Sequence, residues 1–208
     1  MIADDNGLMP RIRAESIEAH KALTRSDIVD AAHEILAEMG SADISLAEVA
    51  YTAGIGRTTL YEYFRDKDDL IASLVEERLP VVVDEMIQSV ADVVSVEDRI
   101  LALASATVRF VVSDPVLGVI LHRELPRLSA DAQGRIRDAH ADLAREMTAT
   151  WMRGVEEGLF RRMAPDVAGR FMNELIMAAA KILISSGEAR FPEVVADLDR
   201  FLLGGLRN

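Results

Sequence analysis

Residues 45–64 read SLAEVAYTAGIGRTTLYEYF, and RDKDDL follows directly at residues 65–70. Ser45 and Glu48 have the spacing of a capping box, which predicts that a helix begins at Ser45. Gly54 stands where this helix must end and the chain must reverse, a position that favours a residue tolerating positive φ. The stretch therefore predicts two short helices joined by a tight turn. Six apolar residues have the spacing to lock this pair together: Leu46, Val49, Ala53, Ile55, Leu60 and Phe64.

The second helix of the pair carries polar and aromatic side chains away from its apolar face. These are Arg57, Thr58, Thr59, Tyr61, Glu62 and Tyr63. A helix that enters the DNA major groove needs such hydrogen-bond donors, methyl groups and aromatic rings, whereas a merely solvated surface helix does not. An ordinary helical hairpin without a ligand is the alternative. The pattern favours a helix-turn-helix DNA-binding motif.

The segment GIGRTTLYEYFRDKDDL, residues 54–70, resembles the N-terminal DNA-binding segment of the TetR family of bacterial transcriptional regulators. The resemblance covers about residues 24–74 and rests on a glycine turn, a Leu-Tyr pair, an aromatic residue and a lysine that opens the next helix. Beyond this part the chain is similar to the family only in length and helical character. The sequence departs from the family at Gly56, where a serine or similar cap is common, but glycine is an acceptable, weaker N-cap.

The second helix of the pair is the expected reading helix, the one that enters the major groove. Exposed side chains near its start should contact base edges, and these are Arg57, Thr58 and Tyr61. An arginine pairs with guanine through two hydrogen bonds, and a threonine methyl group meets a thymine methyl group. Thr59 and Tyr63 are better placed for phosphates, which fix register without reading sequence. Lys67 lies in the first turn of the next helix, where its charge and free N–H groups form an anion site. The family resemblance implies the same phosphate contacts for Lys67 and Tyr63.

The composition limits the class of protein. The chain has 208 residues, half of them hydrophobic, which is enough for one large domain or two small ones. Cysteine is absent, so no disulfide framework or thiolate metal site is expected. The sequence opens without a signal-peptide pattern, and no apolar run approaches the ~18 residues that span a bilayer. We therefore expect a cytoplasmic protein without a membrane partner.

The net charge of −12 is unusual for a protein that binds DNA. Residues 1–75 alone contain seven Lys or Arg against fourteen Asp or Glu. Because non-specific DNA affinity comes mostly from basic charge, acidic surroundings should suppress it and favour a narrow set of sites. We therefore expect a small basic DNA-binding surface on an otherwise acidic protein. Its affinity for specific DNA should depend only weakly on salt concentration.

Apolar residues recur with the period of a helix along the whole chain, and no segment shows the alternation of apolar and polar residues that is typical of a strand. The prediction is an all-α protein of about nine helices, the first of which begins at Thr24 and ends at Gly40. After the two motif helices, further helices are expected over about residues 67–94 with a kink at Pro80, 95–114, 115–126, 129–158, 165–186 and 191–204.

Three parts follow from this pattern: an N-terminal arm over residues 1–21, a helix-turn-helix head over residues 22–66, and a helical body over residues 67–208. The family resemblance implies that this body binds an effector and dimerises. The arm carries Arg11, Arg13 and Lys21. It is either disordered without a role, or it contacts phosphates or the minor groove beside the motif.

The last two expected helices are unusually apolar. The helix over residues 165–186 is apolar on most of its circumference, so it must be buried on more than one side. The last helix has a second apolar stripe. Either one chain buries both faces or a second subunit does. The family resemblance implies a homodimer in which these helices form a four-helix bundle. A symmetric reader also suits a palindromic operator.

Polar or adaptable side chains on otherwise apolar helices are candidates for a ligand pocket, although a stripe of this kind also fits a plain core. Nine methionines fit a surface that repacks around apolar guests. The family resemblance implies a small-molecule inducer, which we expect to be apolar, aromatic or acyl, with one or two polar anchors. The candidates are Arg109, Phe110, His122, His140, Met147, Trp151, Phe171, Asn173 and Met177.

The leading hypothesis is a dimeric, ligand-responsive transcriptional regulator, most often a repressor. A DNA-binding architectural or cell-division factor of the same fold, without an inducer, is the alternative. An enzyme is disfavoured, because the four histidines lack metal-ligand spacing and no glycine-rich phosphate loop occurs. No metal or cofactor is expected. The sequence does not separate a repressor from an activator.

Overall fold

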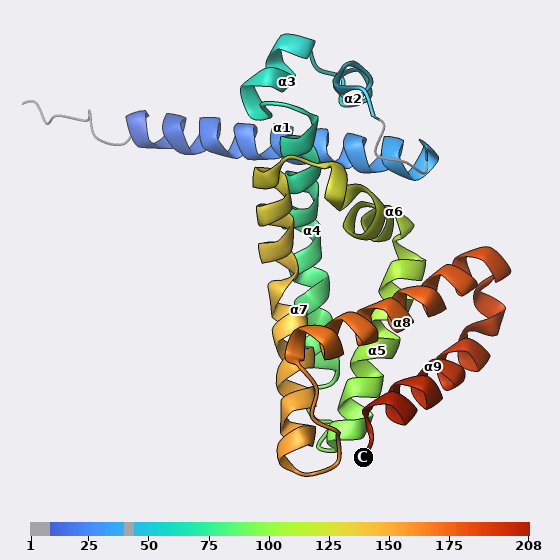
Figure 1. Cartoon of the computed structure of the whole chain (residues 1–208). Coiled ribbons are helices and arrows are strands. Elements are labelled where there is room, and N and C mark those ends of the chain that lie inside the picture. The colour runs from blue at the N-terminus through green and yellow to red at the C-terminus, as the bar shows by residue number, and fades with distance from the viewer. Residues whose placement is uncertain (1–8, 40–43) are drawn as a thin grey trace, which may run out of the picture. The chain divides into compact units, whose positions relative to one another are not determined.

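The structure is a computed structural model that describes residues 9–39 and 44–208 (Figure 1). The described residues form helices and one isolated antiparallel bridge between Phe160 and Arg207, so the predicted all-α class is confirmed. The α-helices are α1 (Met9–Met39), α2 (Leu46–Thr52), α3 (Arg57–Tyr63), α4 (Lys67–Ser89), α5 (Val96–Ser113), α6 (Pro115–Val119), α7 (Ala130–Glu156), α8 (Pro165–Ser186) and α9 (Phe191–Leu206).

The chain divides into two compact units inside α4, between Leu74 and Val75. The first unit, the head, contains α1, α2, α3 and the first two turns of α4. The second unit, the body, contains the rest of the chain. The sequence placed this boundary at the start of α4, after residue 66, because a helix N-terminus is visible as a local pattern whereas a division inside a continuous helix is not.

The motif helices form as the local signals predict. Ser45 Oγ accepts a hydrogen bond from Ala47 N at 3.2 Å, and Ser45 N donates to Glu48 Oε2 at 3.3 Å, so the capping box is present. Gly54 has φ +66°, a conformation in which an L side chain is strained. Of the predicted locking residues, Val49, Leu60 and Phe64 are fully buried. Leu46, Ala53 and Ile55 are half-buried.

The first helix begins earlier than predicted. It starts at Met9, so the prediction that a helix begins at Thr24 is wrong. Thr24 lies inside α1, and its hydroxyl donates to the His20 carbonyl oxygen at 3.0 Å. Inside a helix, a threonine hydroxyl donates to a carbonyl oxygen of the preceding turn in this way, instead of capping the start of a helix. Residues 1–8 of the expected arm, and the expected helix end at Gly40, lie outside the described residues.

Two later helices also differ from the prediction. Asp66 caps α4 as expected, accepting a hydrogen bond from Asp69 N at 2.8 Å. The helix then runs without interruption through Pro80 and ends at Ser89 rather than near residue 94. In place of a single helix to residue 126, α6 is followed by a π-helical turn, Ile120–Glu124, and a 3-10 turn, Leu125–Arg127.

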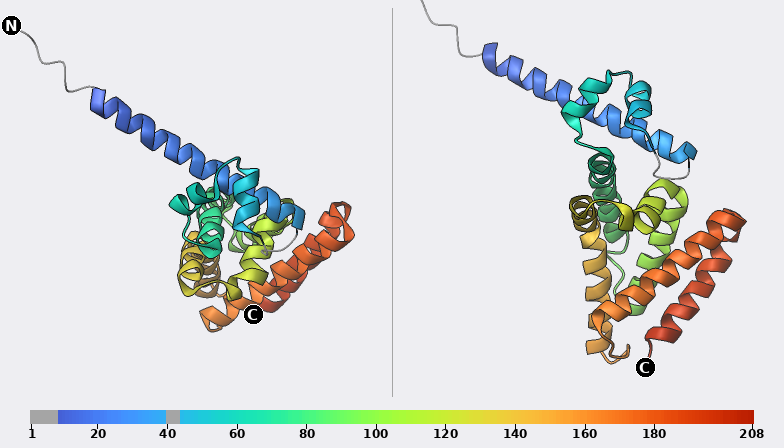
Figure 2. Two further views of the ribbon diagram at one scale, coloured as in Figure 1. Left: turned by 90° about the horizontal axis from the view of Figure 1, so that it is seen from above. Right: turned by 45° about the horizontal axis from the view of Figure 1, so that its top comes forward.

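The body is built around α5, which contacts α6, α7, α8 and α9. Its buried face includes Ile100, Ala104 and Val108 and joins one hydrophobic core with apolar side chains of the last three helices. α8 packs along α9, and the views in Figures 1 and 2 agree that these two helices lie side by side. α7 and α8 are joined by a loop in which buried Phe160 fills the space beside Gly154.

Candidate DNA-binding surface and ligand cavity

The reading helix α3 presents its polar residues outward from the head. Gly56 is its N-cap in an extended conformation and supplies no side-chain cap. Leu60 is completely buried and fixes the helix to the head. Arg57, Thr58 and Tyr61 are exposed, and Tyr61 has 47 % of its surface open. The structure thus brings the three expected base-reading side chains together on one short helix.

Arg57 and Tyr61 interact with each other across one turn of α3. Arg57 Nη2 donates to the Tyr61 hydroxyl oxygen at 3.4 Å, and the guanidinium carbon lies 5.7 Å from the ring centroid. This hydrogen bond raises the pKa of Arg57, so the cation is maintained. The pair restrains a long side chain, which reduces the conformational entropy lost when it binds a partner.

The N-terminus of α4 follows α3 after a three-residue turn and carries Lys67 as its first residue. Tyr63 at the end of α3 and Lys67 are both half-buried. The positive end of the helix dipole and the lysine charge favour an anion here. The carboxylates oppose it: Asp66 accepts from Asp69 N, and Asp69 accepts from Arg65 N at 2.9 Å. This arrangement suits one phosphate held by Lys67 at the margin of an acidic surface.

Two surface residues of the head were missed by the sequence interpretation. Tyr51, on the last turn of α2, has 87 % of its side chain exposed. In the sequence, Tyr51 is an aromatic residue outside the set of apolar positions that α2 buries, and this could have identified it as a surface residue. Arg25, on α1, places its guanidinium 4.7 Å from the ring centroid of Phe64. No local pattern predicts that contact, because the two residues are far apart in sequence.

A cavity of about 1130 Å³ lies between α7 and α8 in the body. Apolar groups dominate its wall, which includes Ile136 and Met152 of α7 and Met172 and Ile176 of α8. α5 contributes Thr107. Three of the predicted ligand residues line this cavity: His140, Met147 and Asn173. A space of this size and chemistry is typical of a site for an apolar small molecule with few polar anchors.

The polar groups of the cavity fall into two sets. His140 is half-buried, and burial lowers the pKa of its imidazole, which favours the neutral ring with one donor and one acceptor nitrogen. Asn173 contributes an amide from α8. Charged residues complete the wall: the exposed side chains of Arg137, Asp138, Arg145, Arg170 and Glu174. Glu174 was recognisable from the sequence as a polar group on an otherwise apolar helix. The other four charged residues were not predicted, since surface charges on amphipathic helices have no distinguishing pattern.

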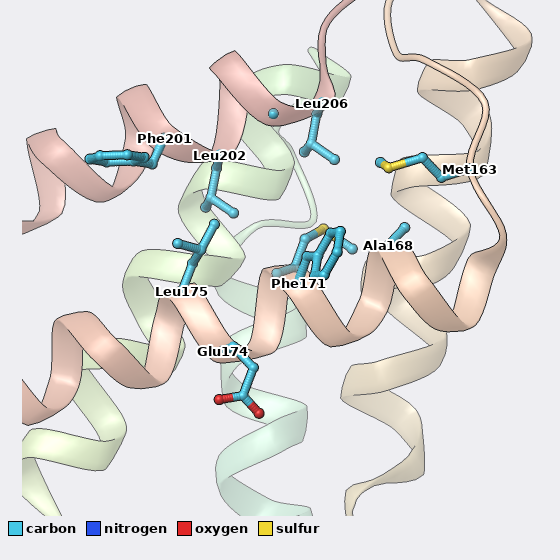
Figure 3. Close-up of a pocket in the computed structure, with 10 residues that line it drawn as sticks. Met163, Ala168, Phe171, Glu174, Leu175, Phe201, Leu202 and Leu206 are labelled. Atoms are coloured by element: carbon cyan, nitrogen blue, oxygen red, sulfur yellow. The ribbon is translucent and has the colours of Figure 1, made fainter.

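The other predicted ligand residues lie elsewhere in the body. The guanidinium carbon of Arg109 lies 4.2 Å from the centroid of the Phe191 ring, and Arg109 lines a separate cavity of about 470 Å³. Phe171 lines a smaller cavity of about 290 Å³ between α8 and α9, shown in Figure 3. Three residues belong to the core or pack against it: Phe110, Trp151 and Met177. His122 lies in the π-helical turn, and its side chain is outside the described part of the chain.

Within residues 9–39 and 44–208, no group of three His, Asp or Glu side chains is placed to hold a metal ion. No helix in the same part of the chain combines the length and the apolar character that crossing a bilayer requires.

Comparison with known proteins matches both units. A family model described as bacterial regulatory proteins, tetR family, matches residues 28–74. A second model, described as a tetracyclin repressor-like C-terminal domain, matches residues 93–206. Among curated proteins, the fatty acid metabolism regulator protein of Bacillus subtilis (strain 168) is 22 % identical over 131 residues, which are 63 % of this chain and 68 % of that protein.

Solved structures share the fold. The transcriptional regulator FadR from Bacillus subtilis, in complex with stearoyl-CoA, aligns with a TM-score of 0.72 and 18 % identity, over 86 % of this chain and 98 % of its own. AibR in complex with isovaleryl coenzyme A and operator DNA aligns with a TM-score of 0.71 and 16 % identity, over 86 % and 98 %. At these identities the likeness shows the fold alone.

Proposed function

The chain belongs to the TetR family of bacterial DNA-binding transcriptional regulators, and we propose that it is a repressor released from its operator by a small, largely apolar ligand. The observation that carries the proposal is the exposed set on α3, Arg57, Thr58 and Tyr61, beside Lys67 at the start of α4. A DNA-reading helix presents its polar side chains in this way, followed by a cation for the backbone.

Each residue of this surface has an expected role. Arg57 pairs with a guanine, the Thr58 methyl group meets a thymine methyl group, and Tyr61 supports Arg57 while contacting the adjacent base. Thr59, Tyr63 and Lys67 bind phosphates and set the register. The operator is a palindrome, because two heads of a symmetric dimer reach major grooves about 34–36 Å apart or a multiple of it.

The homodimer forms through α8 and α9. Their outer faces carry large apolar side chains that one chain leaves open: Phe171 is 60 % exposed, Phe201 71 % and Ile182 45 %. Figure 3 shows Phe171 and Phe201 on the two neighbouring helices. A contiguous apolar surface of this kind is expected to be covered in solution by a partner, and a second copy has the same surface to offer.

The ligand binds in the cavity between α7 and α8. Its apolar wall takes the hydrophobic part of the ligand, and His140 and Asn173 hydrogen-bond a carbonyl or similar acceptor group. Arg137 and Arg170 at the cavity suit an anionic head group. Two relatives of this fold are complexes with acyl-coenzyme A thioesters, which supports an acyl compound as the ligand class.

The alternative is an architectural DNA-binding factor of the same fold without an inducer. A collapsed body without a cavity would favour it. The cavity of about 1130 Å³ in the body therefore supports the ligand-responsive regulator instead.

The test begins with selection of bound duplexes from a random DNA library by the purified full-length protein, followed by fluorescence-anisotropy titration. We expect Arg57→Ala to weaken binding to the selected site by about 5–150-fold and to relax the preference at one base pair. Lys67→Ala should weaken all sequences alike and lower the salt slope. Arg162→Ala, an exposed cation in the loop before α8, is the control and should leave affinity unchanged. Selection of no preferred sequence would sink the proposal.

Ligand release is measured on the same complex. We expect stearoyl-CoA or isovaleryl-CoA, but not free coenzyme A, to lower DNA affinity in the wild-type protein. His140→Phe keeps an aromatic ring but removes the hydrogen bonds, and should weaken this response without changing DNA affinity in the absence of ligand. A response that is unchanged in His140→Phe would place the ligand elsewhere.

A further inference from the structure

We propose that the N-terminal part of α1 is a second DNA-contacting element, which binds the phosphate backbone flanking each operator half-site through Lys21 and Arg25. The inference rests on the proposed function, since it requires the head to bind duplex DNA. It adds a contact outside the helix-turn-helix, in a segment that precedes the part matched by the family model, residues 28–74.

The N-terminal part of α1 has no packing partner within the described head. The side chains of residues 16–23 are all exposed, including Ile17 at 54 % and Leu23 at 64 %. Figures 1 and 2 show this part of the helix running out past α3, with no other described helix of the head beside it. Most helical stability in proteins comes from tertiary packing, so a helix exposed on every side is typical of one that binds something else.

The charge of this segment is opposite to that of the rest of the head. Residues 9–25 contain four basic residues (11, 13, 21, 25) and two acidic ones (15, 18), a net charge of +2. Residues 26–75 contain three basic residues (57, 65, 67) and ten acidic ones, a net charge of −7. Residues 9–25 are therefore more favourable for a polyanion than the acidic stretch that follows them.

The face of α1 that carries Lys21 and Arg25, and with them Glu18, meets the proposed DNA-binding surface at Phe64. Arg25 stacks on Phe64, which caps the C-terminus of α3 and stands between Tyr63 and Lys67, both assigned to phosphates. Lys21 lies one helical turn before Arg25 on the same face. The row formed by Lys21 and Arg25 therefore leads from the end of the reading helix outward along α1. A duplex that takes α3 into its major groove would continue past this row.

A protein or membrane partner fits the segment less well. Ile17 and Leu23 are six positions apart, which places them on different faces of the helix rather than in one stripe. Docking to an apolar groove or a bilayer needs a continuous apolar face. The exposed Lys21 suits a phosphate, which a lysine meets as a point charge, and the half-buried Arg25 lies beside it along the helix.

The experiment compares two duplexes that carry the same selected operator, one ending at the half-sites and one with about six further base pairs on each side. Full-length Lys21→Gln should bind the long duplex about 3–10-fold more weakly than the wild-type protein, and the short duplex equally well. The slope of log affinity against log salt on the long duplex should fall by about 1.8, since each dimer loses two phosphate contacts at about 0.9 each. Lys21→Arg should restore the wild-type values.

Controls separate this inference from folding defects and from the proposed function. Lys21 is exposed, so thermal unfolding of Lys21→Gln followed by circular dichroism should match the wild-type protein. Arg162→Gln removes a remote cation, and equal behaviour of the two variants on the long duplex would overturn the inference. A change of oligomeric mass in Lys21→Gln without DNA would assign the helix to a protein contact and would also overturn it. Failure of the wild-type protein to select any sequence would instead contradict the proposed function.

Discussion

Arg135 on α7 forms a two-pronged ion pair with Glu76 on α4, with Nε 2.9 Å from Oε1 and Nη2 2.5 Å from Oε2. Arg135 directly precedes Ile136 and Arg137, which line the large cavity. Glu76 is the second residue of the body on α4, the helix that continues into the head. One ion pair therefore ties a cavity-lining helix to the helix that both units share.

Glu76→Gln should reduce the ligand's effect on DNA affinity more than it changes DNA affinity itself. The substitution keeps the shape of the side chain but removes the charge that holds Arg135. The pair is about one-third exposed, so its loss should lower the free energy of unfolding by only about 1 kcal/mol or less. Anisotropy titrations with and without ligand give the coupling, and urea unfolding gives the stability.

Glu157→Gln is the matched control, because it removes a more exposed ion pair with Arg153 at the other end of α7. Equal loss of ligand response in both variants, or loss of DNA affinity alone in Glu76→Gln, would refute a coupling role for the ion pair.

Replacing Gly154 or Gly134 of α7 by alanine should change the free energy of unfolding in opposite directions. A Cβ atom at Gly154 would overlap the ring of Phe160, which is 1 % exposed and cannot move aside cheaply. Gly154→Ala should therefore lower the free energy of unfolding by about 1–3 kcal/mol. A Cβ atom at Gly134 meets nothing within 4 Å, so Gly134→Ala should raise it by about 1 kcal/mol through helix propensity. Urea unfolding of both variants checks this, and the same sign for both would refute it.

His140 should make the protein less stable as the pH falls. Burial lowers its pKa in the folded state, whereas the unfolded chain has an ordinary histidine pKa of about 6.5. Below about pH 6.5 the unfolded state binds a proton that the folded state resists, so the free energy of unfolding falls there and is unaffected well above it. Between pH 7.5 and 5.5 the wild-type protein should lose stability more steeply than His140→Gln, by at most about 1.4 kcal/mol per pH unit.

Urea unfolding at several pH values measures this difference, with His20→Gln on the exposed part of α1 as the comparison variant. Identical pH dependence of the wild-type protein and His140→Gln would show that the imidazole is not buried in solution.

Phe201→Glu should convert the dimer to a monomer. Phe201 is 71 % exposed on α9, so a single chain loses little when it is replaced, whereas a partner would have to bury the new carboxylate. Sedimentation velocity should show half the wild-type mass, and affinity for a palindromic operator should fall by at least about tenfold. Val94→Glu, at a site 89 % exposed after α4, is the control and should leave the dimer intact. A dimer that persists in Phe201→Glu would exclude this face.

The local features of the fold were predictable from the sequence because they depend on neighbouring residues. The capping boxes and turns are examples: Ser45 with Glu48, the positive φ of Gly54, and the caps at Asp66, Ser95 and Ser129. The apolar residues Val49, Leu60 and Phe64 were identified as core by spacing alone. Thr24 was misread for the same reason, since a capping pattern and a helix-interior threonine look alike in sequence.

The residues that share the cavity could not be predicted in full. The sequence singled out His140, Met147 and Asn173, which line the cavity, but the same reasoning also selected Arg109, Phe171 and Trp151, which lie elsewhere in the body. Helical periodicity shows that a side chain faces inward. It does not show which neighbouring helix it meets, or whether the space between them is filled.

The sequence by itself determined the helix boundaries around the motif, the all-α class and the residues presented by α3, because helix caps, glycine conformation and apolar period are local properties of the chain. Only the tertiary structure decided the contacts between distant residues, such as Arg135 with Glu76 across 59 positions and Arg25 with Phe64. Such pairs depend on how helices cross, which is set by the packing of the whole core rather than by any one segment.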